Sequence, residues 1–192
     1  MIPLDLLVAA YEEGYFPMGH DDGEIRWHSP DPRAILPLEA FHVPKRLTRV
    51  IRSGRFRVTA DTAFRAVMDA CASGRDDGTW ITGEILETYC ALHDCGLAHS
   101  IEVWLGDRLA GGLYGVSLGG AFFGESMFHA VTDASKVALW HLWDRLRRGR
   151  FQLLDIQWIT PHLDTFGAVE IPRDDYLTRL AVALDGDGRF DG

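Results

Sequence analysis

Hydrophobic and polar positions divide this chain into helical and extended segments that succeed one another along its length. Apolar residues recur at helical spacing in residues 4–13, 44–53, 62–71, 83–95, 133–148 and 175–184. Runs typical of strands occupy residues 24–27, 34–38, 56–59, 99–105, 108–118, 121–128 and 151–158. This order of helices, an antiparallel meander, a long helix and one more strand predicts an α+β domain with an antiparallel or mixed sheet flanked by helices.

One of these strands contains an acid among apolar residues. In the segment 121–128, strand alternation places Phe123, Glu125 and Met127 on one face. A buried carboxylate is costly unless it is paired or hydrogen-bonded. Glu125 therefore either orients a substrate or partner group or satisfies a structural network, and the pattern leaves both interpretations open.

A second polar pair interrupts the strand 151–158. Asp155 and Gln157 share one face of this strand, while Leu154, Ile156 and Trp158 share the other. Two polar side chains at alternate positions of an apolar strand favour a functional role over a structural one.

Charge adds a local pattern to this picture. The chain has 192 residues, of which 47% are hydrophobic, and a net charge of −9, which suits one sizeable domain and disfavours indiscriminate binding of nucleic acid. The predicted helix 44–53 nevertheless carries Lys45, Arg46, Arg49 and Arg52 without an acid. These cations form either a solvated face or a surface that contacts phosphates.

Several classes of protein and site do not match the sequence. No apolar run approaches the roughly 18 residues of a membrane span, and the N-terminus lacks the basic start of a signal peptide. Three cysteines are spaced for neither a zinc site nor a disulfide framework. We therefore expect a cytoplasmic protein with no metal and no membrane contact.

Prolines mark a boundary near the N-terminus. The residues preceding Pro30 and Pro32 are biased away from the α region, so the segment 29–33 cannot be helical. The expected division is a small N-terminal domain, residues 1–31, followed by a main domain, residues 32–192.

Nine segments in collinear order resemble the leucyl/phenylalanyl-tRNA–protein transferases. They are residues 10–17, 27–33, 77–82, 99–104, 111–116, 123–128, 133–136, 155–157 and 167–173. The resemblance implies an acetyltransferase-like (GNAT-like) main domain and an N-terminal domain that is shortened relative to the family. It implies transfer of Leu or Phe from aminoacyl-tRNA to the α-amine of proteins with N-terminal Arg or Lys, which marks them for degradation. No cofactor is needed, because an aminoacyl ester is already activated.

The same resemblance suggests roles for individual residues. Asp155 and Gln157 would hold and help activate the attacking amine, with Asp155 in the larger electrostatic role, and Glu125 would lie near the aminoacyl end. The remaining substrate positions are Leu113, Phe122, Met127, Leu142 and Leu154 for the side chain, and Trp80, Tyr89 and Met18 for the terminal adenine. The basic helix, with Lys45, Arg46, Arg49 and Arg52, would contact the acceptor stem. Many members have Trp at the place of Met18, and a Phe often stands at that of Leu142.

Alternative functions stay open. One is an acetyl-CoA-dependent N-acetyltransferase, although residues 132–136 lack the glycines of a pyrophosphate loop. Another is a catalytically silent tRNA-binding module, which the shortened N-terminus and Met18 motivate. Acceptors with N-terminal Asp or Glu, the preference between Leu and Phe, and the oligomeric state are not legible from the residues.

Overall fold

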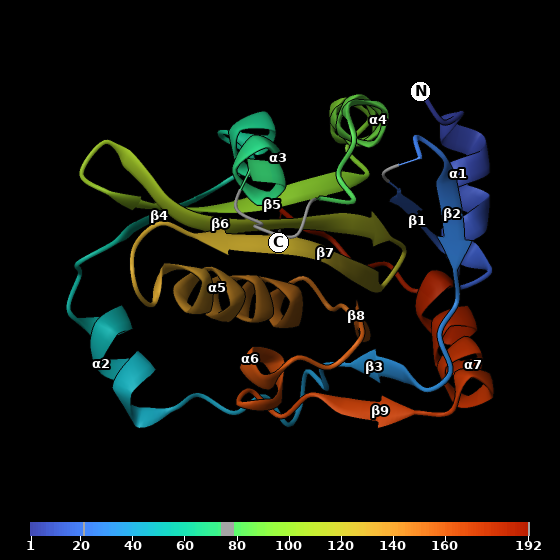
Figure 1. Cartoon of the computed structure of the whole chain (residues 1–192). Helices are drawn as coiled ribbons and strands as arrows, with labels where there is room; N and C mark the ends of the chain where they lie inside the picture. Colours follow the sequence, from blue (N-terminus) through green and yellow to red (C-terminus); the bar gives the residue numbers. More distant parts are fainter. Residues whose placement is uncertain (21, 74–78, 192) are drawn as a thin grey trace.

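The computed structural model describes residues 1–20, 22–73 and 79–191, and two residues of the segment 77–82 lie outside that part. Its helices are α1 (Leu4–Glu12), α2 (Lys45–Arg52), α3 (Phe64–Ser73), α4 (Gly83–Asp94), α5 (Ala134–Arg148), α6 (Pro161–Asp164) and α7 (Arg173–Leu184) (Figure 1). Its strands are β1 (Phe16–Gly19), β2 (Ile25–His28), β3 (Arg33–Ile35), β4 (Arg57–Ala60), β5 (Ala98–Leu105), β6 (Arg108–Leu118), β7 (Ala121–His129), β8 (Leu153–Gln157) and β9 (Val169–Ile171). Within the described residues, no helix is long and apolar enough to cross a membrane.

A mixed seven-stranded sheet forms the centre of the molecule. Its strand order is β4-β5-β6-β7-β8-β3-β9, and every neighbouring pair is antiparallel except β7 with β8. These two strands are parallel because α5 carries the chain back between them. Strands β1 and β2 form a separate antiparallel pair. The predicted α+β sheet with flanking helices is confirmed, whereas the short edge strand β9 was not predicted.

Helices cover both faces of this sheet (Figure 1). On one face α3 and α4 pack with α1 and α7 around a core that includes Phe64, Ile85 and Phe123. On the other face α5 packs with α2 and α6 around a second core that includes Leu47 and Leu142. The first 31 residues contribute buried side chains to the first core, so the N-terminal segment shares its packing with the main body.

A β-bulge in β7 changes the expected alternation. Tyr114 pairs with Ser126 while Gly115 pairs with Gly124, so Glu125 is the extra residue. As a result Phe123 packs in the first core and Met127 against the second. The prediction that Phe123, Glu125 and Met127 share a face is therefore wrong, because one inserted residue shifts the two-residue period. Gly115 permits the close approach, since a Cβ there would lie 2.2 Å from the carbonyl oxygen of Phe123.

Strands β7 and β8 pair only at their beginnings. Their register runs from Ala121 with Leu153 to Phe123 with Asp155. Both strands continue beyond this point, and residues from both line the same cavity. The sheet therefore opens between two strands that still belong to its centre.

Candidate active site

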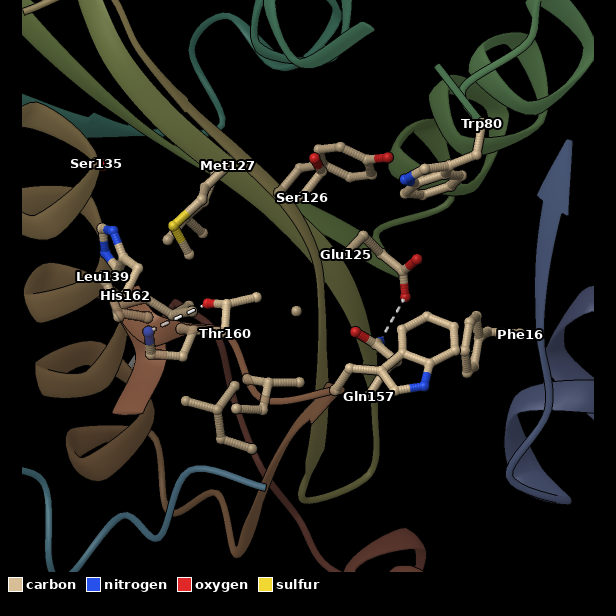
Figure 2. A pocket seen from close by; sticks show the side chains of 18 of the residues that line it. Phe16, Trp80, Glu125, Ser126, Met127, Ser135, Leu139, Gln157, Thr160 and His162 are labelled. Carbon is tan, nitrogen blue, oxygen red and sulfur yellow. Dashed lines mark hydrogen bonds between the residues drawn. The ribbon is translucent and has the colours of Figure 1, made fainter. Parts of the chain in front are cut away.

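A cavity of about 470 Å³ lies where β7 and β8 separate. Its walls come from β1, β6, β7, α5, β8 and the α6 region (Figure 2). The apolar part is formed by Leu113, Met127, Leu139, Leu142, Leu154 and Ile156. A second, partly aromatic part of the lining consists of Phe16, Met18 and Trp80. The cavity is also lined by two polar side chains, Glu125 and Gln157.

Most of the substrate positions suggested by the sequence line this cavity. They are Met18, Trp80, Leu113, Glu125, Met127, Leu142, Leu154 and Gln157. Phe122 does not line it, because its ring is fully buried against Phe151 and Phe190, at centroid distances of 6.2 and 5.7 Å. Tyr89 and Asp155 also lie behind the wall rather than on it.

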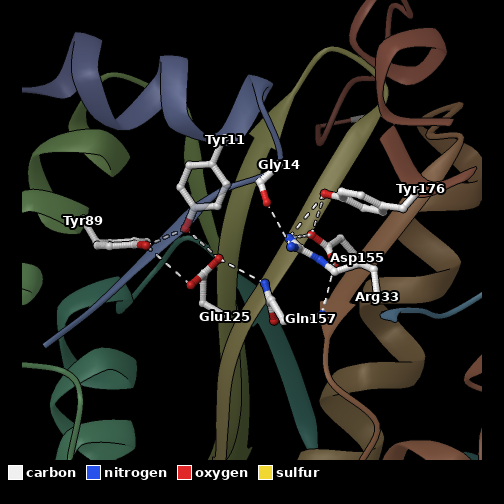
Figure 3. Close-up of polar contacts among 8 residues, drawn as sticks. All are labelled: Tyr11, Gly14, Arg33, Tyr89, Glu125, Asp155, Gln157 and Tyr176. Carbon is white, nitrogen blue, oxygen red and sulfur yellow. Dashed lines mark hydrogen bonds and ion pairs between the residues drawn. The ribbon is translucent and has the colours of Figure 1, made fainter. Parts of the chain in front are cut away.

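Two buried tyrosines hold the carboxyl group of Glu125 (Figure 3). The Tyr11 hydroxyl donates to Oε1 at 2.7 Å, and the Tyr89 hydroxyl donates to Oε2 at 3.4 Å. The two hydroxyls are also hydrogen-bonded to each other. Gln157 Nε2 completes the network by donating to Glu125 Oε1 at 3.4 Å. Tyr89 therefore supports Glu125 from inside the core and does not offer a stacking face beside Trp80.

Burial dominates the protonation of this network. The pKa of Glu125 is raised to about 8, mainly because burial desolvates its carboxyl group; the charge of Asp155 adds to this rise, whereas the Tyr11 hydroxyl and Arg33 favour the ionised form. Burial also raises the pKa values of Tyr11 and Tyr89, so both stay hydrogen-bond donors. A cation bound in the cavity would shift Glu125 toward the carboxylate.

Asp155 forms a buried ion pair with Arg33. Arg33 Nε donates to Oδ1 at 2.9 Å and Nη2 donates to Oδ2 at 2.6 Å, and both residues have 0% exposed side chain. The Tyr176 hydroxyl donates to Oδ2 at 2.9 Å. This bidentate geometry is the strongest kind of carboxylate pairing in proteins. Partners from α7, β3 and β8 thus contact both oxygens of Asp155, and its expected role at an attacking amine stays a prediction.

Gln157 ends β8 in a left-handed backbone conformation. Its φ is 59°, and its amide nitrogen donates to Asp155 Oδ1 at 2.9 Å. The Asp155 side chain contacts Arg33 and Tyr176, and the Gln157 side chain contacts Glu125. The turn breaks the alternation at Trp158, which packs edge-on against Phe16 at 5.1 Å and does not continue the face of Ile156.

The basic helix α2 lies near the N-terminus of α5. Lys45, Arg46, Arg49 and Arg52 are all exposed. Arg46 Nη2 pairs with the carboxylate of Asp133 at 3.1 Å, directly before the first residue of α5. The helix is therefore tied to one end of the cavity wall, since Ser135 in the first turn of α5 lines the cavity.

Four important side chains were not singled out from the sequence. Tyr11 was detectable, because it lies four residues after the buried Leu7 on α1. Arg33, Tyr176 and His162 gave no local signal, because their partners or cavity contacts come from distant segments. His162 lines the cavity with its Nε2 atom buried and without a partner, and burial lowers its pKa. Within the described ranges, no three His, Cys, Asp or Glu side chains could jointly hold a metal ion.

The cavity thus combines an apolar part with a carboxyl group and an amide, a composition typical of a site for a small amphiphilic ligand such as an amino-acid derivative. A family model described as leucyl/phenylalanyl-tRNA protein transferase matches residues 35–181, and the model of that family's N-terminal domain matches residues 1–31. The chain belongs to the leucyl/phenylalanyl-tRNA protein transferase family.

Curated relatives of the same family name match nearly the whole of this chain. A leucyl/phenylalanyl-tRNA–protein transferase of Salinibacter ruber is 56% identical over 182 residues, which cover 94% of this chain and 80% of the relative. The proteins of that name from Gluconobacter oxydans and Herpetosiphon aurantiacus are 57% and 55% identical, with 82% and 96% of their lengths covered. The match covers 94% and 96% of this chain, respectively.

Two solved structures are more distantly similar. L-PGS from Bacillus licheniformis aligns with a TM-score of 0.46 at 11% identity, over 79% of this chain and 49% of that one. A GCN5-related N-acetyltransferase-like protein from Streptococcus suis aligns with a TM-score of 0.42 at 14% identity, over 87% and 63% of the two chains. Both scores are below 0.5, so the fold assignment rests on the sheet order itself.

Proposed function

We propose that this protein transfers Leu or Phe from aminoacyl-tRNA to the α-amine of a protein that begins with Arg or Lys, and that the product is marked for degradation. The donor and acceptor are those that the relatives' names indicate, a charged tRNA and a protein. The aminoacyl-tRNA donor makes the cytoplasm the expected site of the reaction. We also propose that residues 1–31 and 32–192 act as one unit in forming the site, because side chains of both line the cavity.

The observation that carries this proposal is the composition of the cavity. Leu113, Leu142 and Leu154 are buried aliphatic side chains that suit an apolar group without a branch at Cβ, such as the side chain of Leu or Phe. A hydrophobic pocket distinguishes similar side chains by about 1–3 kcal/mol. Trp80 and Met18, which are partly exposed on the same wall, provide a surface for the terminal adenine, where stacking is worth roughly 1–3 kcal/mol per base.

The reaction itself needs little more than positioning. The acceptor nitrogen attacks the ester carbonyl, the bond from that carbon to the ribose oxygen breaks, and a proton from the nitrogen ends on the released ribose hydroxyl. Because Gln157 Nε2 faces Glu125, the amide oxygen of Gln157 is directed away from that carboxyl group and can accept a hydrogen bond from the attacking amine. Glu125 binds the aminoacyl amine. Holding both reactants in this geometry supplies much of the rate.

Transfer of radiolabelled Leu or Phe from tRNA to a model protein with N-terminal Arg tests the proposal. Parallel reactions contain a model protein with N-terminal Asp, or acetyl-CoA in place of aminoacyl-tRNA. We expect transfer to the Arg protein. Acetyl transfer alone would support an N-acetyltransferase instead, and tRNA binding without transfer would support a silent binding module.

Two variants connect this activity with the cavity. Gln157→Ala removes the amide on the cavity wall and is expected to lower transfer about a hundredfold. Gln152→Ala is the matched control, because Gln152 is exposed just before β8, and it should transfer at the wild-type rate. Equal activities of the two variants would show that the reaction does not take place in this cavity.

A further inference from the structure

Gln157, one of the polar residues on the cavity wall, has a strained backbone conformation. Gln157 has a φ of 59°, in the left-handed region that side chains with a Cβ disfavour. This conformation ends β8 and places the Gln157 amide 3.4 Å from Glu125. A residue in such a conformation persists only where its surroundings hold it, and strained residues cluster at functional sites.

Asp155 is the group that holds Gln157. Its Oδ1 accepts the backbone N–H of Gln157 and Arg33 Nε, each at 2.9 Å. Its Oδ2 accepts Arg33 Nη2 at 2.6 Å and the Tyr176 hydroxyl at 2.9 Å. Both oxygens are therefore engaged by protein donors, and Asp155 is not among the residues that line the cavity. The carboxylate shapes the wall from behind.

Arg33 also holds the segment that follows α1. Its Nη1 donates to the carbonyl oxygen of Gly14 at 2.9 Å, just after α1. Helix α1 carries Tyr11, the hydroxyl of which donates to Glu125. The Arg33 guanidinium lies over the ring of Phe16 at 4.9 Å and over that of Tyr176 at 4.4 Å. The fully buried guanidinium of Arg33 thus connects the end of β8, which carries Gln157, with the end of α1, which carries the Tyr11 that contacts Glu125 (Figure 3).

We propose that Arg33 and Tyr176 are positioning residues for aminoacyl transfer, which act by holding Asp155 and, through it, the backbone of Gln157. The inference rests on the proposed function and deepens it. It differs from the sequence-based expectation that Asp155 and Gln157 both hold and help activate the attacking amine. Asp155 instead orients Gln157, and Gln157 meets the substrate.

Neither Arg33 nor Tyr176 titrates near neutral pH. Burial raises the pKa of Tyr176, and the charge of Asp155 adds to this effect, so its hydroxyl remains a donor. Burial alone would lower the pKa of Arg33, but the neighbouring Asp155 outweighs it and the net shift is upward. Substituting Arg33 or Tyr176 should therefore change the rate of transfer without shifting the midpoint of its pH profile.

The first test removes one hydroxyl. Tyr176→Phe keeps the ring over Arg33 and is expected to lower kcat about ten- to a hundredfold, with KM for aminoacyl-tRNA unchanged. The midpoint of the pH–rate profile should stay in place. Tyr15→Phe is the control, because Tyr15 is 43% exposed. A wild-type kcat would overturn the proposal, and so would a shifted acidic limb, which would mark Asp155 as a proton acceptor.

A double-mutant cycle shows whether Tyr176 acts through Asp155. In an Asp155→Asn background, Tyr176→Phe should lower kcat by a much smaller factor than in the wild type, because the group that it supports has already changed. Equal factors in both backgrounds would show that Tyr176 acts independently and would contradict the proposed chain of contacts.

The second test does not depend on activity. Hydrogen exchange at the Gln157 amide, followed by NMR, should be about tenfold faster in Tyr176→Phe and in Arg33→Lys than in the wild type. The amide of Val116 in the central strand β6 serves as the internal control and should be unchanged. Unchanged exchange at Gln157 would overturn the inference. Failure of the wild type to transfer Leu would count against the proposed function instead, and the exchange data would still decide whether Arg33 and Tyr176 hold Gln157.

Discussion

Glu125 carries a large electrostatic cost for a single residue. The bulge directs it toward two buried tyrosines, and the pKa of its carboxyl group is raised from 4.5 to about 8, with desolvation as the largest cause. The tyrosine hydroxyls reduce this cost but do not remove it. Such a group is suited to receive a substrate amine, because a bound cation restores the charge that burial suppresses.

Stability should therefore depend on pH through Glu125. Between pH 4.5 and about 8 the folded protein holds a proton that the unfolded chain releases, so the free energy of unfolding falls as pH rises, by about 1.4 kcal/mol per unit. Below pH 4.5 this loss is absent. Glu125→Gln should remove the slope, which urea unfolding at about pH 5 and about pH 8 would measure.

The exposed Glu24 provides the control for this experiment. Glu24→Gln should follow the wild-type pH dependence, because its carboxyl group is solvated in the folded and unfolded chains alike. If the unfolding free energies of the wild type and Glu125→Gln differ by the same amount at both pH values, the buried proton is not on Glu125.

We also expect single residues to set the size of the proposed pocket for the Leu or Phe side chain. Leu142 is 1% exposed and lines the cavity, so Leu142→Phe should occupy part of its volume. We expect transfer of Phe to fall about tenfold relative to Leu, measured as the ratio of the two kcat/KM values. Leu146→Phe enlarges a buried residue one turn further along α5 that does not line the cavity. It should reduce stability and leave the ratio unchanged, and a change of ratio in both variants would refute this assignment.

At the scale of elements, the exposed face of α2 is the expected binding surface for the tRNA backbone. Replacing Lys45, Arg49 and Arg52 by Ala should weaken binding of different tRNAs equally. The slope of the logarithm of the binding constant against the logarithm of salt concentration should become shallower by about one for each phosphate that is no longer neutralised. Arg46 is left in place because it pairs with Asp133. Filter binding at several salt concentrations provides the measurement.

The opposite end of α5 supplies the control with the same change of charge. Arg147, Arg148 and Arg150 are exposed there, and replacing these three by Ala should change tRNA binding much less. Equal effects of the two triple variants would mean that total charge, rather than the position of α2, determines binding.

Elements with a clear period were predictable from the sequence, whereas contacts between them were not. The α+β order and the polar pair of β8 followed from alternation. The glycines of the neighbouring strand, Gly115 among them, indicated a close approach or a bulge, but nothing around Glu125 itself marked it as the extra residue. The pairing of Arg33 with Asp155 spans 122 positions, and a proline-rich segment gave no reason to expect a buried guanidinium. Resemblance identified Asp155, but only geometry shows what occupies its oxygens.

At the scale of the whole molecule, the N-terminal segment and the main body share one core. Leu7 and Tyr11 of α1 are 0% exposed and belong to the first core, which side chains of the main body also form. Leu7→Ala should therefore lower the free energy of unfolding of the entire protein by about 2–5 kcal/mol. Calorimetry, circular dichroism and tryptophan fluorescence should report a single transition.

The neighbouring Leu6 gives a matched control on the same helix. It is 52% exposed, so Leu6→Ala should change the unfolding free energy by less than about 0.5 kcal/mol. Two separate transitions in the wild type, or equal effects of Leu6→Ala and Leu7→Ala, would show that the first 31 residues fold apart from the rest.

The buried pair of Arg33 and Asp155 also limits how this sequence can drift over evolution. Removing either partner strands a charge in the core, at a cost of about 3–5 kcal/mol, whereas exchanging both at once for apolar residues is often neutral. No sequence of single codon changes leads from one state to the other without passing through a destabilised protein. A lineage released from selection for transferase activity would therefore keep this pair long after the rest of its site had diverged.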